Sequence, residues 1–175
     1  MAKGDQKIVD LPFQTWIVMV DQYNRVRFPL DEVRVLVPWL PDKSGPFECI
    51  AMPGASGGIE LSPAADHYSV VAQFVEAMRD MQGPVIPGKW LDVARLMATV
   101  WLIKVNIEAN RVSVTLPEPP RKAQLLPQAA GIAVVFAAAG IFEIWDAAKW
   151  NEYMRETAKR RAGLISEALE DLGRG

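Results

Sequence analysis

Cysteine and histidine are almost absent from this chain of 175 residues. Cys49 is the single cysteine, which excludes an internal disulfide and any zinc site built from several cysteines. His67 is the single histidine, which excludes metal sites and acid–base pairs that need two imidazoles. No nucleophile–base set or paired acid–base set is recognisable beside them. We therefore expect no catalytic residue, no metal, no cofactor and no small-molecule substrate.

Charge of one sign and long apolar runs are also missing. The chain has 19 Lys and Arg against 21 Asp and Glu, a net charge of −2. This balance argues against a generally basic nucleic-acid-coating protein but leaves room for a local basic patch. The most apolar stretch, residues 129–144, contains two glycines and Glu143 and is shorter than the roughly 20 apolar residues of a spanning helix. The first 14 residues hold no uninterrupted apolar run, so we expect a cytoplasmic protein with no membrane partner.

Half of the residues are apolar, which is enough to bury a core. Two glycines and two prolines fall within residues 82–88, and such a segment cannot continue a helix or a central strand. We therefore predict a first unit at residues 1–81, a linker at 82–88, a second unit at 89–156 and a C-terminal helical extension at 157–175.

The two units carry signs of an internal repeat. Asn-Arg-Val follows an apolar, strand-like run at Asn24 and again at Asn110, 86 positions later. Glu60 and Glu143, which lie 83 positions apart, each precede a predicted helix start. The sequence thus predicts the same order in both halves: strand, tight turn, strand, short helix or loop, two strands and a longer helix. Because Asn tolerates positive φ, both asparagines are predicted to hold it in their turns.

Two segments carry a resemblance to a known family. Residues 138–153, with Glu-Ile-Trp-Asp followed by a helix bearing Trp and Tyr, closely resemble the C-terminal signature of MraZ proteins. Residues 21–29 are similar to the Asp-x-x-Gly-Arg-Val-x-Ile-Pro turn of that family, with Asn24 in the place of its glycine. The resemblance covers residues 13–156. It implies a mixed β fold with α-helices: a double-split β-barrel of two tandem AbrB-like swapped-hairpin units related by internal pseudo-symmetry.

The second half departs from the family pattern at two positions. Ile107 stands where the motif has its aspartate, with Glu108 next to it. Thr115 stands where the motif has its proline. The chain is therefore similar to a divergent member of the family, and we expect the fold to carry over better than the DNA sequence that it recognises.

The resemblance implies a transcription regulator that binds double-stranded DNA at promoter repeats as a homo-oligomeric ring in the nucleoid. Its turns would face the DNA. Asp21 would orient Arg25, whose guanidinium can reach a phosphate or a guanine edge through two hydrogen bonds. Arg27 shares the face of Arg25 if the segment is a strand. The DNA-binding residues expected from both turns are Asp21, Asn24, Arg25, Arg27, Asn110 and Arg111.

Other interpretations remain open at this point. Asp21 and Arg25 could form an ion pair that only stabilises a turn. The chain could be a ring-forming scaffold or protein-interaction module that has lost DNA binding, as the acidic balance and the second-half departures favour. Trp39, in a proline-rich loop, could belong to the core or to a subunit contact. A basic cluster is best interpreted as a solvated helix face: Arg155, Lys159, Arg160 and Arg161.

Overall fold

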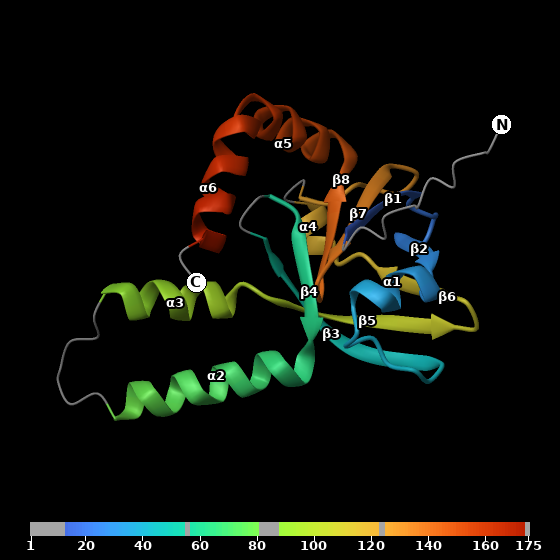
Figure 1. The fold of residues 1–175 in the computed structure, drawn as a ribbon. Coiled ribbons are helices and arrows are strands. Elements are labelled where there is room, and N and C mark those ends of the chain that lie inside the picture. The colour runs from blue at the N-terminus through green and yellow to red at the C-terminus, as the bar shows by residue number, and fades with distance from the viewer. Residues whose placement is uncertain (1–12, 55–56, 81–87, 123–124, 174–175) are drawn as a thin grey trace.

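The computed structural model describes residues 13–54, 57–80, 88–122 and 125–173 (Figure 1). In the first half these residues form β1 (Phe13–Met19), β2 (Arg25–Pro29), α1 (Leu30–Leu36), β3 (Gly45–Pro53), β4 (Ile59–Pro63) and α2 (Ala64–Arg79). In the second half they form α3 (Gly88–Ala98), β5 (Trp101–Glu108), β6 (Arg111–Thr115), α4 (Glu118–Lys122), β7 (Ile132–Ala138), β8 (Ile141–Asp146), α5 (Ala147–Lys159) and α6 (Arg161–Gly173). The predicted mixed fold is confirmed, and each half contains the predicted order of strands and helices; α3, which precedes the strands of the second half, was not predicted. Of the predicted linker, residues 82–87 lie outside the described residues, and α3 begins at Gly88.

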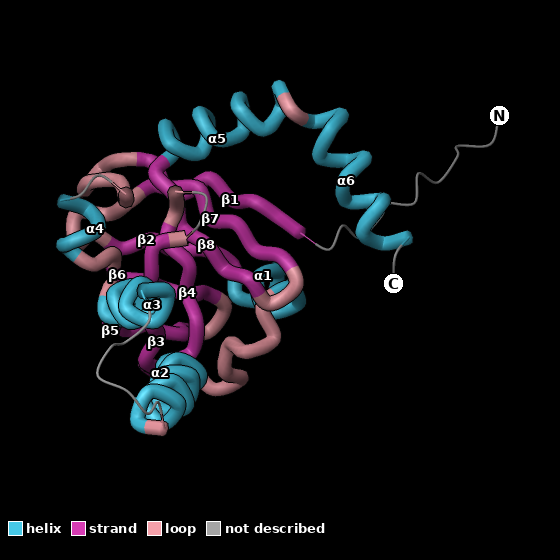
Figure 2. Tube along the Cα trace, turned by 90° about the vertical axis from the view of Figure 1, so that its left-hand side faces the viewer, coloured by secondary structure: helices cyan, strands magenta, loops and turns pink. Residues whose placement is uncertain are grey.

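The strands of the described residues form one antiparallel sheet in the order β1-β7-β8-β4-β3-β5-β6-β2. The strands at the two ends of this order, β1 and β2, contact each other, so the sheet is nearly closed and barrel-like (Figure 2). Buried and exposed residues alternate along the strands, and the buried ones are apolar side chains on the inner face of the barrel. In β2, for example, Val26 and Phe28 are buried between exposed or half-buried neighbours.

The strand pairing is symmetric between the two halves of the chain, with β1 to β4 in the first half and β5 to β8 in the second. The first strand of each half pairs with the third strand of the other, β1 with β7 and β5 with β3. The second strands pair with each other, with Arg27 opposite Ser113. The fourth strands also pair, with Glu60 opposite Glu143. Each half therefore depends on the other for its sheet, and the halves are not independent barrels.

Aromatic side chains join the core to the surrounding elements. Phe28 and Phe142 meet edge to face with ring centroids 5.2 Å apart. Trp39 is half-buried near Phe142, and its indole N–H donates a hydrogen bond of 2.7 Å to the carbonyl of Gly140. Of the two interpretations of Trp39, the structure therefore favours packing within its own chain.

Two helical segments project from the barrel (Figures 1 and 2). In one, α2 and α3 are joined by stacking of Phe74 on Trp90 at 5.1 Å. In the other, α5 packs on β7 and β8, and Trp150 lies 5.3 Å from the ring of the fully buried Trp145. Asp146 caps the start of α5 by accepting hydrogen bonds from the N–H groups of Ala148 and Lys149.

No helix in the described part of the chain is long and apolar enough to cross a bilayer.

Candidate nucleic-acid interface

The turn between β1 and β2 is organised by the carboxylate of Asp21. Its Oδ1 accepts hydrogen bonds from the backbone N–H groups of Tyr23 (2.8 Å) and Arg25 (2.9 Å), which is an Asx-type turn. Its own N–H donates to the carbonyl of Arg25 at 2.9 Å. Asn24 has φ 58°, so the positive φ predicted there is confirmed.

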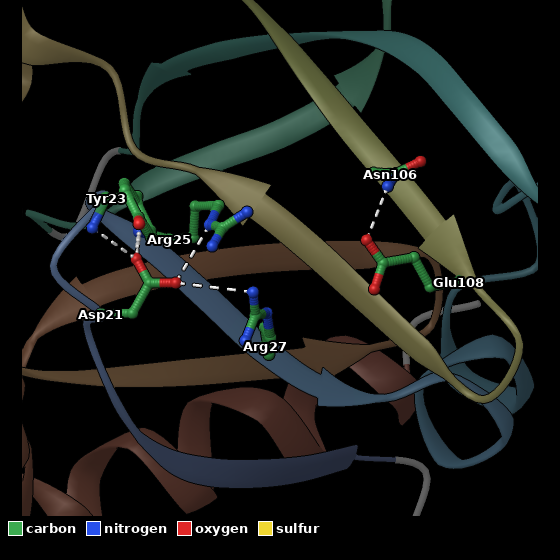
Figure 3. Close-up of polar contacts among 6 residues, drawn as sticks. All are labelled: Asp21, Tyr23, Arg25, Arg27, Asn106 and Glu108. Carbon is green, nitrogen blue, oxygen red and sulfur yellow. Dashed lines mark hydrogen bonds and ion pairs between the residues drawn. The ribbon is translucent and has the colours of Figure 1, made fainter.

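The other oxygen of Asp21 faces two arginines (Figure 3). Asp21 Oδ2 lies 3.0 Å from Nε of Arg25 and 3.6 Å from Nη2 of Arg27. The Arg25 guanidinium also lies 4.8 Å above the ring centroid of Tyr23, within the range of a cation–π contact. Arg25 is thus fixed by a carboxylate and a ring, while its side chain stays 31% exposed.

These contacts also set the charge state of Asp21. Partial burial raises the pKa of its carboxyl, but the N–H groups of Arg25 and Tyr23 and the Arg25 guanidinium outweigh that effect. The pKa of Asp21 therefore lies below its ordinary value. The carboxylate is ionised at neutral pH and available to both arginines.

Arg121, at the end of the short helix α4, supports the same turn and was not predicted. Its Nη1 donates to Oδ1 of Asn24 at 3.0 Å, and its Nε donates to the carbonyl of Leu116 at 3.3 Å. The N–H of Leu116 in turn donates to the carbonyl of Asn24 at 2.8 Å. Arg121 lies 97 positions from Asn24, so no local sequence pattern connects them.

The turn between β5 and β6 is shorter, and one prediction made for it is wrong. Positive φ falls on Ala109, at 32°, and not on Asn110. The reason is the pairing of Glu108 with Arg111, which leaves only Ala109 and Asn110 to reverse the chain. In such two-residue turns the first central residue takes positive φ in type II′. Asn110 instead uses its carbonyl to accept a hydrogen bond from the N–H of Leu30, at 2.9 Å.

The second turn also contains a carboxylate, Glu108, one position after the place predicted for it from the motif. Ile107 is buried, as Val20 is before the first turn, so Glu108 and not Ile107 is the structural counterpart of Asp21. Glu108 lies opposite Arg111 in the ladder, but its Oε1 accepts a hydrogen bond of 2.8 Å from the side-chain amide of Asn106 (Figure 3). Glu108 is therefore the counterpart of Asp21, but its hydrogen bond is with the side-chain amide of Asn106 and not with an arginine.

The three predicted arginines lie on one outer face of the paired strands β2 and β6. Arg25 is opposite Thr115, Arg27 opposite Ser113 and Arg111 opposite Pro29, and directly opposite residues of an antiparallel ladder point to the same side. Arg25 and Arg111 therefore stand about 13 Å apart along the strands, with Arg27 between them.

A pocket of about 360 Å³ opens at one end of this face. Its lining brings together three of the predicted residues with two others: Arg27, Phe28, Pro29, Asn110 and Arg111. The remaining predicted residues, Asp21, Asn24 and Arg25, form the turn at the other end of β2. The fold thus gathers both turns on one surface, which we call the arginine face (Arg25, Arg27 and Arg111).

Comparison of the chain with known protein families and with curated proteins gives no match. Within the described residues, no three His, Cys, Asp or Glu side chains come together as metal ligands would. The site is therefore defined by its geometry and charge.

Proposed function

We propose that this protein is a sequence-specific, double-stranded-DNA-binding transcription regulator of MraZ type, acting in the nucleoid of the cytoplasm. The observation that carries the proposal is the arginine face. A two-stranded β-ribbon fits the major groove of B-DNA, which is about 12 Å wide. Because Asp21 and Tyr23 fix the guanidinium of Arg25, this arginine is suited to a hydrogen-bonded contact of fixed geometry, such as one with a guanine edge. Arg27 is less constrained and is suited to a contact with a phosphate.

The exchange of strands between the halves supports the finer fold that this proposal includes. Pairing of β1 with β7 and of β5 with β3 is what two tandem AbrB-like swapped-hairpin units would make within one chain. The double-split barrel and its internal pseudo-symmetry are part of the proposal.

We further infer that the chain assembles with itself, as a ring, on repeated promoter sites. The supporting observation is an apolar outer face of β1 and β7, where Ile17 and Met19 are 79% and 71% exposed and Met19 lies opposite the exposed Ile132. Such patches on soluble proteins mark contact surfaces. Several arginine faces on one particle would add their contacts to DNA, which suits a chain with net charge −2.

One observation favours the alternative, a ring-forming scaffold or interaction module that has lost DNA binding. Carboxylates are interspersed with the cations around the arginine face. Asp21 is shared by two arginines, Glu108 lies opposite Arg111, and Glu48 lies opposite Lys104 on the next strand. These carboxylates reduce the positive potential that DNA binding needs.

Titration of a labelled duplex from the region upstream of the gene, at several salt concentrations, tests the proposal. Each lost phosphate contact should flatten the log–log salt slope by about 0.9 per bound subunit. We expect Arg25→Ala to weaken binding, Arg27→Ala to weaken binding and flatten the slope, and Arg111→Ala to have a smaller effect. Arg95→Ala, which removes an exposed cation of α3 paired with Asp92, is the matched control and should change neither quantity.

Two outcomes would contradict the proposal. Absence of salt-dependent binding by the wild-type protein would favour the scaffold. If Arg25→Ala instead lowers the melting temperature strongly, the pair of Asp21 and Arg25 serves the turn and not DNA.

A further inference from the structure

The segment α5–α6, residues 147–173, projects from the barrel as an arm (Figure 2). Several apolar side chains on it are exposed. Tyr153 and Met154 of α5 are 36% and 45% exposed, and Ile165 and Leu169 of α6 are 50% and 64% exposed. All but one of the described side chains of α6 are exposed. Since an isolated helix of about 13 residues is marginally stable in water, α6 needs a surface to pack against.

The apolar residues of α6 form a single stripe. Leu164, Ile165, Ala168 and Leu169 recur at the spacing that places them on one side of a helix. Glu167 and Asp171, four residues apart, are neighbours along the helix surface beside them. A partner must therefore offer an apolar stripe flanked by positive charge.

The charges of the arm are sorted along its length. Residues 147–161 contain five Lys or Arg and two Glu, a net charge of +3. Residues 162–175 contain one Arg and three acidic residues, a net charge of −2. The basic cluster interpreted above as a solvated face lies in the first part. The arm is therefore complementary to a second arm that runs in the opposite direction.

The dimensions of the arm fit such a pairing. Helices α5 and α6 have 13 residues each, about 20 Å, so the α5 of one copy matches the α6 of another in length. In a two-fold arrangement the same contact occurs twice, with α5 on the α6 of the partner and the reverse. Within one arm, α6 turns away from α5 in both views (Figures 1 and 2), so α6 does not lie along the α5 of its own chain.

We propose that the α5–α6 arm is a two-fold interface between two copies of this chain. In it the basic α5 of each copy packs against the acidic α6 of the other around the exposed apolar stripes. This contact is separate from the β1–β7 face and does not require DNA binding. A nucleic acid is a poorer occupant, because the −2 charge of residues 162–175 would repel its phosphates.

Charge reversal with mixing tests this interface on the full chain. One variant, Arg155→Glu with Lys159→Glu, makes both ends of the arm acidic. The other, Glu167→Lys with Asp171→Lys, makes both ends basic. We expect each variant alone to have at most half the wild-type mass by sedimentation velocity, because like charges meet. An equimolar mixture of the two should regain the wild-type mass, because every contact is then between opposite charges.

An apolar substitution provides an independent arm of the test. Leu169→Asp should also halve the mass, while Val35→Asp, at an 82% exposed position of α1, is the matched control and should leave it unchanged. A wild-type monomer at micromolar concentration, unchanged masses in the reversal variants, or a mixture that does not recover would each overturn the proposal. So would a loss of duplex binding in Arg155→Glu with Lys159→Glu at unchanged mass, which would assign the cluster to DNA. Weakened DNA binding in Arg25→Ala has no bearing on this interface, so the two proposals fail separately.

Discussion

The turn between β1 and β2 and the turn between β5 and β6 join equivalent strands and present equivalent arginines, yet they are held differently. The first is fixed by side chains: Asp21 accepts two backbone hydrogen bonds, and Arg121 binds Asn24 from the other half of the chain. The second is fixed by the strand ladder, with Glu108 paired directly with Arg111. The difference shows that a repeat can keep its strand pairing while its side-chain restraints diverge.

The largest expected difference between the turns is in their tolerance of a β-branched residue. Asn24→Val places valine at φ 58° and removes the acceptor of Arg121, so it should lower the free energy of unfolding by about 2 kcal/mol. Asn110→Val, at an exposed position without positive φ, should change it by less than about 0.5 kcal/mol. Urea denaturation measures both. Equal losses would mean that the two turns have the same conformation.

The sequence predicted the mixed fold and the first turn because both depend on local patterns. The order of strands and helices follows from apolar runs and turn residues, and Asn24 at positive φ follows from a residue type that tolerates it. The shared Asn-Arg-Val then led to the same expectation for Asn110. That expectation was wrong because the second connection is a two-residue turn in which the first central residue, Ala109, takes positive φ and Asn110 does not.

The restraints contributed by the other half could not be predicted in the same way. Arg121 reaches Asn24 only because β2 and β6 pair, and the two residues are 97 positions apart. The role of Glu108 depends on register: a shift of one residue in a strand exchanges its buried and exposed sides, so Ile107 and Glu108 can be told apart only by burial.

A second prediction compares the two carboxylates. Asp21→Asn should lower the urea midpoint, because the amide NH2 that replaces Oδ2 is a donor and cannot accept from the guanidinium groups of Arg25 and Arg27. The amide oxygen can still accept from the backbone N–H groups of the turn. Glu108→Gln should leave the midpoint nearly unchanged, since a glutamine oxygen can still accept from Asn106. If Glu108→Gln is as destabilising as Asp21→Asn, the second turn depends on its carboxylate as much as the first does.

Acid titration should sharpen this contrast. The pKa of Asp21 is lower in the folded state than in the unfolded chain, so its stabilisation is present above the unfolded pKa of about 4 and is lost as pH falls through the folded pKa. The stability difference between wild type and Asp21→Asn should therefore shrink between about pH 5 and pH 2. Denaturation curves collected at each pH measure it. A constant difference would show that the charge of Asp21 contributes nothing.

Glu60 serves as a control for the acid titration, because its pKa is shifted in the opposite direction to that of Asp21. Its burial and the neighbouring charge of Glu143 raise the pKa of Glu60 above the ordinary value. Ionised Glu60 therefore destabilises the folded protein at pH values above its raised folded pKa. This destabilisation is lost as pH falls through that pKa and the carboxyl is protonated. Glu60→Gln should raise the stability at pH 7 and remove this dependence, whereas the difference attributed to Asp21 should persist in the Glu60→Gln background.

The smallest expected effect concerns Ala109, the residue that carries the positive φ of the second turn. At φ 32° its Cβ is strained, at a cost of order 1 kcal/mol for an L-residue. Ala109→Gly removes that strain but also increases the backbone entropy of the unfolded chain, which offsets part of the gain. We expect a net stabilisation of about 0.5 kcal/mol, measured by urea denaturation. Asn110→Gly is the matched control: without positive φ to relieve, it should give no gain. If Asn110→Gly stabilises the protein and Ala109→Gly does not, positive φ belongs to Asn110. The second turn would then resemble the first, in which the asparagine holds positive φ, in spite of the direct pairing of Glu108 with Arg111.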